Sequence, residues 1–148
     1  MASKRQQILD AMVSKLQGTG VFALVTKSVI SPDDVREFPV AMVLGGDAEY
    51  TPLTATQYTS GPTHDSPDGW NIHVFAYVNG VRDTDRVNVM ENIIKTIMDA
   101  VFADITLGVT FVQATYLSAV MPSYDWERNI GIAEIVWSVK YDFEKSNT

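Results

Sequence analysis

The residue types best suited to metal chemistry lie close together near the middle of this sequence. His64, Asp65 and Asp68 offer an imidazole and two carboxylates within a short stretch, and these groups are common ligands of zinc and calcium. The residues between and after them, Ser66-Pro67 and Gly69, are types that turns prefer. The sequence therefore favours a solvated loop here over a metal site.

A second candidate for chemistry is His73, which is one of only two histidines. It alternates with Ile72 and Val74 in a strand-like pattern and is expected to point outward. Acid–base catalysis by histidine needs a paired acid or nucleophile, and none lies at a recognisable spacing. His73 is therefore predicted to be a surface or half-buried residue rather than a catalytic base.

Other forms of catalysis have little support in the sequence. It contains no cysteine, and it lacks the G-x-S-x-G turn that presents a nucleophilic serine. Gly18-Thr19-Gly20 precedes a predicted strand, and Gly45-Gly46 is followed by Asp47, so neither forms the phosphate-binding start of a helix. No cofactor is expected. A pair of catalytic carboxylates from distant positions stays open, because sequence spacing cannot reveal it.

The composition is that of one acidic globular domain covering residues 1–148. The chain has 46% hydrophobic residues and a net charge of −7, with only 11 lysines and arginines scattered along it. Scattered cations neutralise phosphates poorly, so general nucleic-acid binding is not expected. A membrane span needs about 20 apolar residues, and none is present. The start of the sequence lacks an apolar signal region, so synthesis in a cytoplasm is expected.

Hydrophobic periodicity predicts an α+β fold. Ser3 and Gln6 form a capping box, after which apolar residues at helical spacing continue to Leu16 and Gly18 ends the helix. The other expected elements are a strand over Val21–Thr26, a turn over Ser31–Asp34, a buried strand over Phe38–Leu44, weak alternation over Glu49–Tyr58, a loop over Ser60–Gly69, a strand over Trp70–Val78, a helix over Thr84–Phe102 capped by Asp83 or Thr84, a strand over Val109–Val120, a turn over Met121–Trp126 and a closing strand over Ile130–Phe143. We expect a mostly antiparallel sheet, two main helices packed on one face, and a long C-terminal β-hairpin.

The closing strand has a clear core side and a mostly polar side. The residues predicted to face the core are Ala133, Ile135, Trp137, Val139, Tyr141 and Phe143. The other side carries Glu134, Ser138, Lys140 and Asp142, interrupted by the apolar residues Ile132 and Val136. A strand this long exceeds the usual 5–6 residues. We therefore expect it to overhang the core or to pair outside its own domain, and we expect a partner to cover Ile132 and Val136.

Two further groups of residues are candidates for contact with a partner. Tyr124, Trp126 and Arg128 lie in or beside the predicted turn, and these types are enriched at interface hot spots. Trp126 is expected either to make such a contact or to cap the core. Lys4 and Arg5 lie at the positive end of the first helix dipole. They form either a solvated first turn or a contact with an acidic neighbour.

The order and phrasing of these segments resemble the tail terminator, or tail completion, proteins of long-tailed bacteriophages. The resemblance covers nearly the whole chain and rests on segments rather than on a catalytic motif. These segments are the helix opened by Lys4–Met12, the strand Pro39–Leu44 with its exit Gly45-Gly46-Asp47-Ala48-Glu49, the strand Trp70–Val78, the helix ending near Phe102 and the hairpin closing on Val139-Lys140-Tyr141.

The resemblance implies a structural protein of the virion, assembled in the host cytoplasm and located at the tail neck. Such proteins form a ring, typically a hexamer, on the head-proximal end of the tail tube. They end tube polymerisation and present the surface that joins the head-completion or connector protein. The expected partners are further copies of the chain, the tail tube protein and the head connector. DNA would pass through an acidic lumen without specific binding, and no membrane is involved.

Two other classes of function stay open at this stage. The first is another neck, connector or tail-completion adaptor, which is also a structural role. The second is a small cytoplasmic enzyme that uses scattered carboxylates for acid–base hydrolysis. Self-association separates the enzyme from the ring, and neighbouring genes for tube and tape-measure proteins separate the two structural roles.

Overall fold

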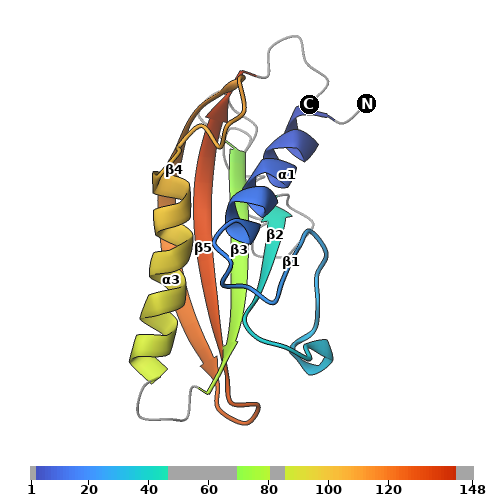
Figure 1. Ribbon diagram of the computed structural model, residues 1–148, viewed down its shortest axis with the longest axis vertical. Coiled ribbons are helices and arrows are strands. Elements are labelled where there is room, and N and C mark those ends of the chain that lie inside the picture. Colours follow the sequence, from blue (N-terminus) through green and yellow to red (C-terminus); the bar gives the residue numbers. More distant parts are fainter. Residues whose placement is uncertain (1–2, 47–69, 81–85, 143–148) are drawn as a thin grey trace, which may run out of the picture.

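The structure is a computed structural model that describes residues 3–46, 70–80 and 86–142. Figure 1 shows the arrangement of its elements. In chain order these are α1 (Lys4–Gln17), β1 (Leu24–Thr26), the 3₁₀ helix η1 (Pro32–Asp34), β2 (Val40–Gly45), β3 (Trp70–Asn79), α3 (Arg86–Phe102), β4 (Val112–Asp125) and β5 (Ile130–Tyr141). The expectations for Glu49–Tyr58, Ser60–Gly69, the cap at Asp83 or Thr84, and Phe143 lie outside the described residues.

The strands form one sheet in the order β1-β2-β3-β5-β4. β1 runs parallel to β2, and every other neighbouring pair is antiparallel. Both helices lie on the same face of this sheet, and the last two strands form a long hairpin (Figure 1). The predicted α+β class, the shared helix face and the C-terminal hairpin are confirmed.

Helix α1 begins as its sequence predicts. The Ser3 hydroxyl accepts a hydrogen bond from the Gln6 backbone N–H at 3.1 Å, and the Gln6 side chain accepts one from the Ser3 backbone N–H at 2.9 Å. This capping box satisfies two N–H groups that a helix start leaves without partners. Ile8, Met12 and Leu16 then form the buried stripe against the sheet.

The main core lies between the two helices and the sheet. On β5 the predicted alternation is confirmed for the described residues, since the side chains at 133, 135, 137, 139 and 141 are all buried. Trp70 on β3 and Trp137 on β5 are the largest fully buried side chains. The ring of Phe102, at the end of α3, meets the Trp137 ring edge-on at 5.4 Å between centroids. The helices thus seal the core over the C-terminal half of β5.

The expectation that β5 overhangs its own domain is wrong. β5 lies inside the sheet, paired with β3 from Ile130 to Val139 and with β4 from Ile130 to Tyr141. Its length is matched by a 14-residue β4 on one side and a 10-residue β3 on the other. The long strand therefore satisfies its backbone groups within this chain, and β1 and β4 are the edges of the sheet that the described strands form.

The predicted turn at Met121–Trp126 is also wrong, because β4 continues to Asp125. Met121 pairs with Glu134, and Asp125 pairs with Ile130. Pro122 suggested a turn, but an edge strand tolerates proline because only one of its sides must be hydrogen-bonded. Alternation does not reveal this end of the strand, because Met121, Pro122 and Ser123 are all exposed.

Three strand starts differ from the sequence prediction as well. β2 begins at Val40 rather than Phe38, and the other two starts are displaced further. β1 covers only Leu24–Thr26 rather than Val21–Thr26, and β4 begins at Val112 rather than Val109. In both places the apolar residues before the strand pack against the core from loop conformations: Phe22 and Val109 are partly buried there. Burial of a residue does not require a strand, so composition alone placed these starts too early.

The second face of the sheet carries its own small apolar cluster. Met42, Tyr77 and Ile130 are its buried centre, and the partly buried residues around them are Ile30, Val35, Phe38, Phe75 and Ile132. Val136, farther along the same face, is only 6% exposed. The expectation that Ile132 and Val136 need a partner to cover them is therefore wrong, since the single chain already buries or packs both.

Gly45 tests the packing of the main core. A Cβ atom at this position would lie 2.7 Å from Cζ2 of Trp70, which is closer than real contacts allow. We predict that Gly45→Ala lowers the free energy of unfolding by about 1–3 kcal/mol, because the rigid indole must move. Chemical denaturation measures the change. In a Trp70→Phe background the same substitution should cost less, and an equal cost in both backgrounds would show that the indole is not the obstacle.

Thr115 gives a prediction of increased rather than decreased stability. It is 2% exposed, and its hydroxyl oxygen has no hydrogen-bond partner among the described residues. A buried hydroxyl without a partner is destabilising, so Thr115→Val should raise the free energy of unfolding by about 1 kcal/mol. The matched control is Thr106→Val, whose hydroxyl donates to Asp104 at 2.8 Å and whose loss should lower stability. Thermal melting of both variants checks the pair, and a destabilised Thr115→Val would contradict the assignment.

Candidate functional site

Two aromatic side chains, Tyr124 and Trp126, lie together at the tip of the β4–β5 hairpin. The rings of Tyr124 and Trp126 stack with centroids 5.0 Å apart and planes 8° from parallel. Tyr124 is half-buried against the main core, whereas Trp126 is 49% exposed. Trp126 therefore does not cap the core. It rests on Tyr124, which fixes the orientation of an indole that is available to a partner.

Arg128 holds this hairpin tip against the rest of the molecule. Its Nε and Nη2 donate to the two carboxylate oxygens of Asp33 at 2.6 and 3.2 Å, and Nη1 donates to Asp125 at 2.6 Å. Two-pronged pairing of this kind fixes geometry as well as charge. The hydrogen bonds from Arg128 lower the pKa of both carboxyl groups below the ordinary aspartate range. The tip is thus tied to helix η1, which is about a hundred residues away in the sequence.

Lys4 and Arg5 lie at the opposite end of β5. Lys4 Nζ donates to the Asp142 carbonyl oxygen at 2.6 Å and lies 5.3 Å from the centroid of the Phe111 ring. The Arg5 guanidinium lies 4.9 Å from the centroid of the Trp70 ring, and its Nε donates to the Tyr141 hydroxyl at 3.1 Å. The expectation of a solvated first turn is wrong, because these cations attach the start of α1 to the end of the closing strand.

His73 and Glu134 form a hydrogen-bonded pair on the second face of the sheet. His73 Nδ1 lies 2.7 Å from Glu134 Oε2, and each side chain is about a quarter exposed. The imidazole also stacks on Phe75, with centroids 6.3 Å apart. A carboxylate beside an imidazole is two-thirds of a catalytic triad. Among the described residues, however, no serine or threonine hydroxyl is hydrogen-bonded to His73, so the pair orients two side chains without a nucleophile.

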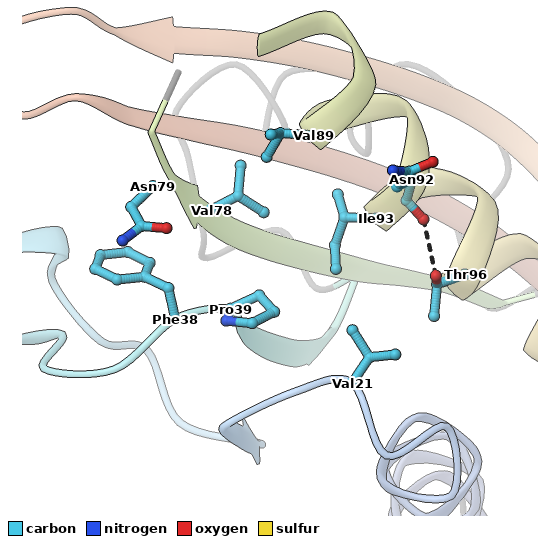
Figure 2. Close-up of a pocket in the computed structure, with 9 residues that line it drawn as sticks. All are labelled: Val21, Phe38, Pro39, Val78, Asn79, Val89, Asn92, Ile93 and Thr96. Atoms are coloured by element: carbon cyan, nitrogen blue, oxygen red, sulfur yellow. Dashed lines mark hydrogen bonds between the residues drawn. The ribbon is translucent and has the colours of Figure 1, made fainter. Parts of the chain in front are cut away.

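A cavity of about 260 Å³ opens between α3, the end of β3 and the segment before β2 (Figure 2). Its apolar walls are Val21, Phe38, Pro39, Val78, Val89 and Ile93, and its polar groups are Asn79, Asn92 and Thr96. The Thr96 hydroxyl donates to the Asn92 backbone carbonyl at 2.8 Å, as the dashed line in Figure 2 marks. None of the lining side chains can titrate, so this cavity offers no acid–base chemistry.

The remaining sequence candidates are His64, Asp65, Asp68 and Lys140. His64, Asp65 and Asp68 lie outside the described residues. Within the described ranges, no three histidine, aspartate or glutamate side chains converge as a metal site, and no helix of those ranges is both long and apolar enough to cross a membrane. Lys140 is exposed on the second face of β5, on the same face as Glu134.

The structure places the two groups of candidate contact residues at opposite ends of the sheet. Tyr124, Trp126 and Arg128 come together at the hairpin tip, whereas Lys4, Arg5 and Asp142 gather at the other end of the sheet. Sequence reasoning missed the pairing of Arg128 with Asp33, the hydrogen-bonded pair of His73 with Glu134, and the position of β4 at an edge of the described sheet. Of these, only the pairing of Arg128 could have been suspected, from the turn-forming aspartates beside Pro32.

Comparison with known proteins adds no assignment. No protein-family model matches the chain, and no curated protein matches it by sequence.

The tie at the hairpin tip gives a prediction about pH. Both carboxyl pKa values are lowered in the folded protein, so the ion pairs stabilise it above the ordinary aspartate pKa, and this contribution disappears as the pH falls through the folded values, below about pH 4. We predict that Arg128→Gln raises the pKa of Asp33 and Asp125 toward the ordinary range. An NMR titration of the aspartate carboxyl carbons measures this.

The control for that titration is Lys95→Gln. Lys95 pairs with Asp99 on the exposed side of α3, so its loss should leave Asp33 and Asp125 unchanged. If Arg128→Gln left both carboxyl pKa values as low as in the wild type, the guanidinium would not be their cause.

Proposed function

We propose that this chain is a tail terminator of a long-tailed bacteriophage. In this role it forms a ring, with six subunits as the expected number, on the head-proximal end of the tail tube. The ring stops further addition of tube subunits and presents the surface that joins the head connector. The protein then belongs to the virion neck and uses no cofactor and no catalytic residue.

The observation that supports this proposal most directly is the layout of the fold. A capped N-terminal helix, a buried strand, a second strand, a long helix and a closing hairpin follow one another in the order on which the resemblance rests. The described strands form an open sheet, with β1 and β4 at its two edges. An open sheet with two different edges suits a cyclic assembly, in which one patch meets a different patch on the neighbour.

The hairpin tip supplies a second, smaller argument. A joining surface needs side chains that are exposed yet held in place, because ordering a mobile side chain on binding costs free energy. Trp126 has this property through its stack on Tyr124 and the Arg128 tie next to it. We assign Trp126 to the surface that meets the tube or the head connector. The net charge of −7 would let DNA pass a ring lumen without sticking.

The direct test is to image the purified protein by electron microscopy, alone and mixed with tail tubes. The proposal expects rings at one end of each tube and a tube length that no longer grows when free tube subunits are added. Light scattering of the free and the tube-bound protein gives the number of subunits. A protein that stays monomeric in both states, and leaves tube growth unchanged, would overturn the proposal.

Trp126 can be tested within the same assay. We predict that Trp126→Ala folds normally and weakens attachment to the tube or head partner by about tenfold, as expected for an aromatic hot spot. The matched control is Ile105→Ala, which removes an exposed apolar side chain of similar exposure between α3 and β4. Equal attachment of wild type and Trp126→Ala would remove the hairpin tip from the joining surface.

A further inference from the structure

The edge strand β4 lacks the charges that usually protect such an edge. It runs for 14 residues, and from Val112 to Tyr124 it carries no charged side chain. On one side it pairs with β5, and on the other it pairs with no described strand. A long, uncharged edge is a template for another strand. Pro122 and the two register shifts, which also hinder edge pairing, restrict it to the short stretches between them.

Exposed apolar side chains accompany this edge. Tyr116 and Met121 are 55% and 46% exposed. Their pairing partners on β5 are Ser138 and Glu134, so both side chains lie on the second face of the sheet, away from the helices.

The opposite edge of the same sheet has a complementary shape. β1 pairs only with β2 among the described strands, and Leu24 on it is 46% exposed. Beside it lies a cavity of about 230 Å³ whose apolar walls are formed by Ala23, Leu24, Ile30, Val35 and Val40 and whose charged lining residues are Asp34, Arg36 and Glu37. Ile30 and Val35 belong to the cluster that covers the second face. The cavity at one edge and Met121 at the other therefore lie on the same face.

The strand directions also suit a contact between copies. β1 runs parallel to β2, and the three following pairs are antiparallel, so β1 and β4 point in opposite directions. Rotation of a copy about an axis along the strands keeps each strand's direction. It would bring β4 of one subunit beside β1 of the next in antiparallel orientation, which gives well-aligned hydrogen bonds. Figure 1 shows the two strands at opposite sides of the sheet.

We propose that β4 of one subunit pairs with β1 of the next, and that Met121 enters the cavity beside the neighbour's β1. This contact covers both exposed edges with one heterologous interface, and a methionine side chain adapts well to such an irregular apolar cavity. β1 is only three residues long, so the apolar contact supplies most of the binding and the backbone bonds set the register. The inference rests on the proposed ring and names the contact that closes it.

Cysteine crosslinking tests the pairing without a background reaction, because the sequence contains no cysteine. Ser123 on β4 and Ala23 beside β1 are both small and exposed, and they come close together when Met121 lies beside Leu24 of the neighbour in an antiparallel pair. With a short bifunctional maleimide, the double variant Ser123→Cys/Ala23→Cys should give a ladder of multimers that ends at the ring size. Each single variant should stay monomeric on a denaturing gel. Both the free and the tube-bound protein are used.

The outcomes separate this inference from the proposed function. Dimers from Ser123→Cys alone would mean that β4 pairs with β4 across a two-fold axis, which overturns the β4–β1 contact. Rings seen by light scattering without a ladder from the double variant would also overturn it, while the ring itself stands. A monomer in both the free and the tube-bound state would overturn the contact and the ring together.

A substitution supplies an independent measurement. Met121→Asp should weaken self-association by at least about tenfold, because a carboxylate loses the contact that methionine makes with the apolar walls of the cavity. The far-ultraviolet circular dichroism and melting temperature should stay close to wild type, since Met121 is exposed in the single chain. Ile105→Asp is the matched control and should leave association unchanged. Unaltered association of Met121→Asp would exclude Met121 from the interface.

Discussion

The fold depends on one constraint, which is that β5 must be hydrogen-bonded on both of its sides. It pairs with β3 through ten residues and with β4 along its whole length. Its core-facing side chains include Trp137, which is completely buried and packs against Phe102 of α3. Because an unpaired strand in this central position would leave buried backbone groups without partners, the positions of β3, β4 and the helix above them all follow from it.

The ends of this strand are fixed by charged side chains that reach across the chain. Arg128 ties the hairpin tip to Asp33, and Lys4 and Arg5 attach the first turn of α1 to the last residues of β5. Exposed ion pairs contribute little to the free energy of unfolding, so their main effect is geometric. At the hairpin tip, the Arg128 tie and the stack on Tyr124 keep Trp126 in a single orientation, which is what a docking side chain requires.

Pairing on both sides of β5 leaves β4 and β1 as the two edges of the sheet that the described strands form. The same arrangement that removes β5 from any external contact gives β4 an uncharged edge and gives β1 a neighbouring apolar cavity. Assembly of copies through these edges would complete the backbone pairing that the single chain leaves open. The proposed ring thus depends on the strand order rather than on the length of the closing strand.

The sequence by itself determined the α+β class, the capping box at Ser3, the buried strand β2 and the core side of β5, because each depends on local spacing of apolar and polar residues. It could not reveal that β4 passes through Pro122 to Asp125, because the consecutive exposed side chains of Met121, Pro122 and Ser123 show no alternation of buried and exposed positions. Pairing of His73 with Glu134 and of Arg128 with Asp33 depends on register and on contacts between distant segments. Only the tertiary structure decided which strand is the edge, because strand order is set by how the helices and strands pack together and not by any one segment.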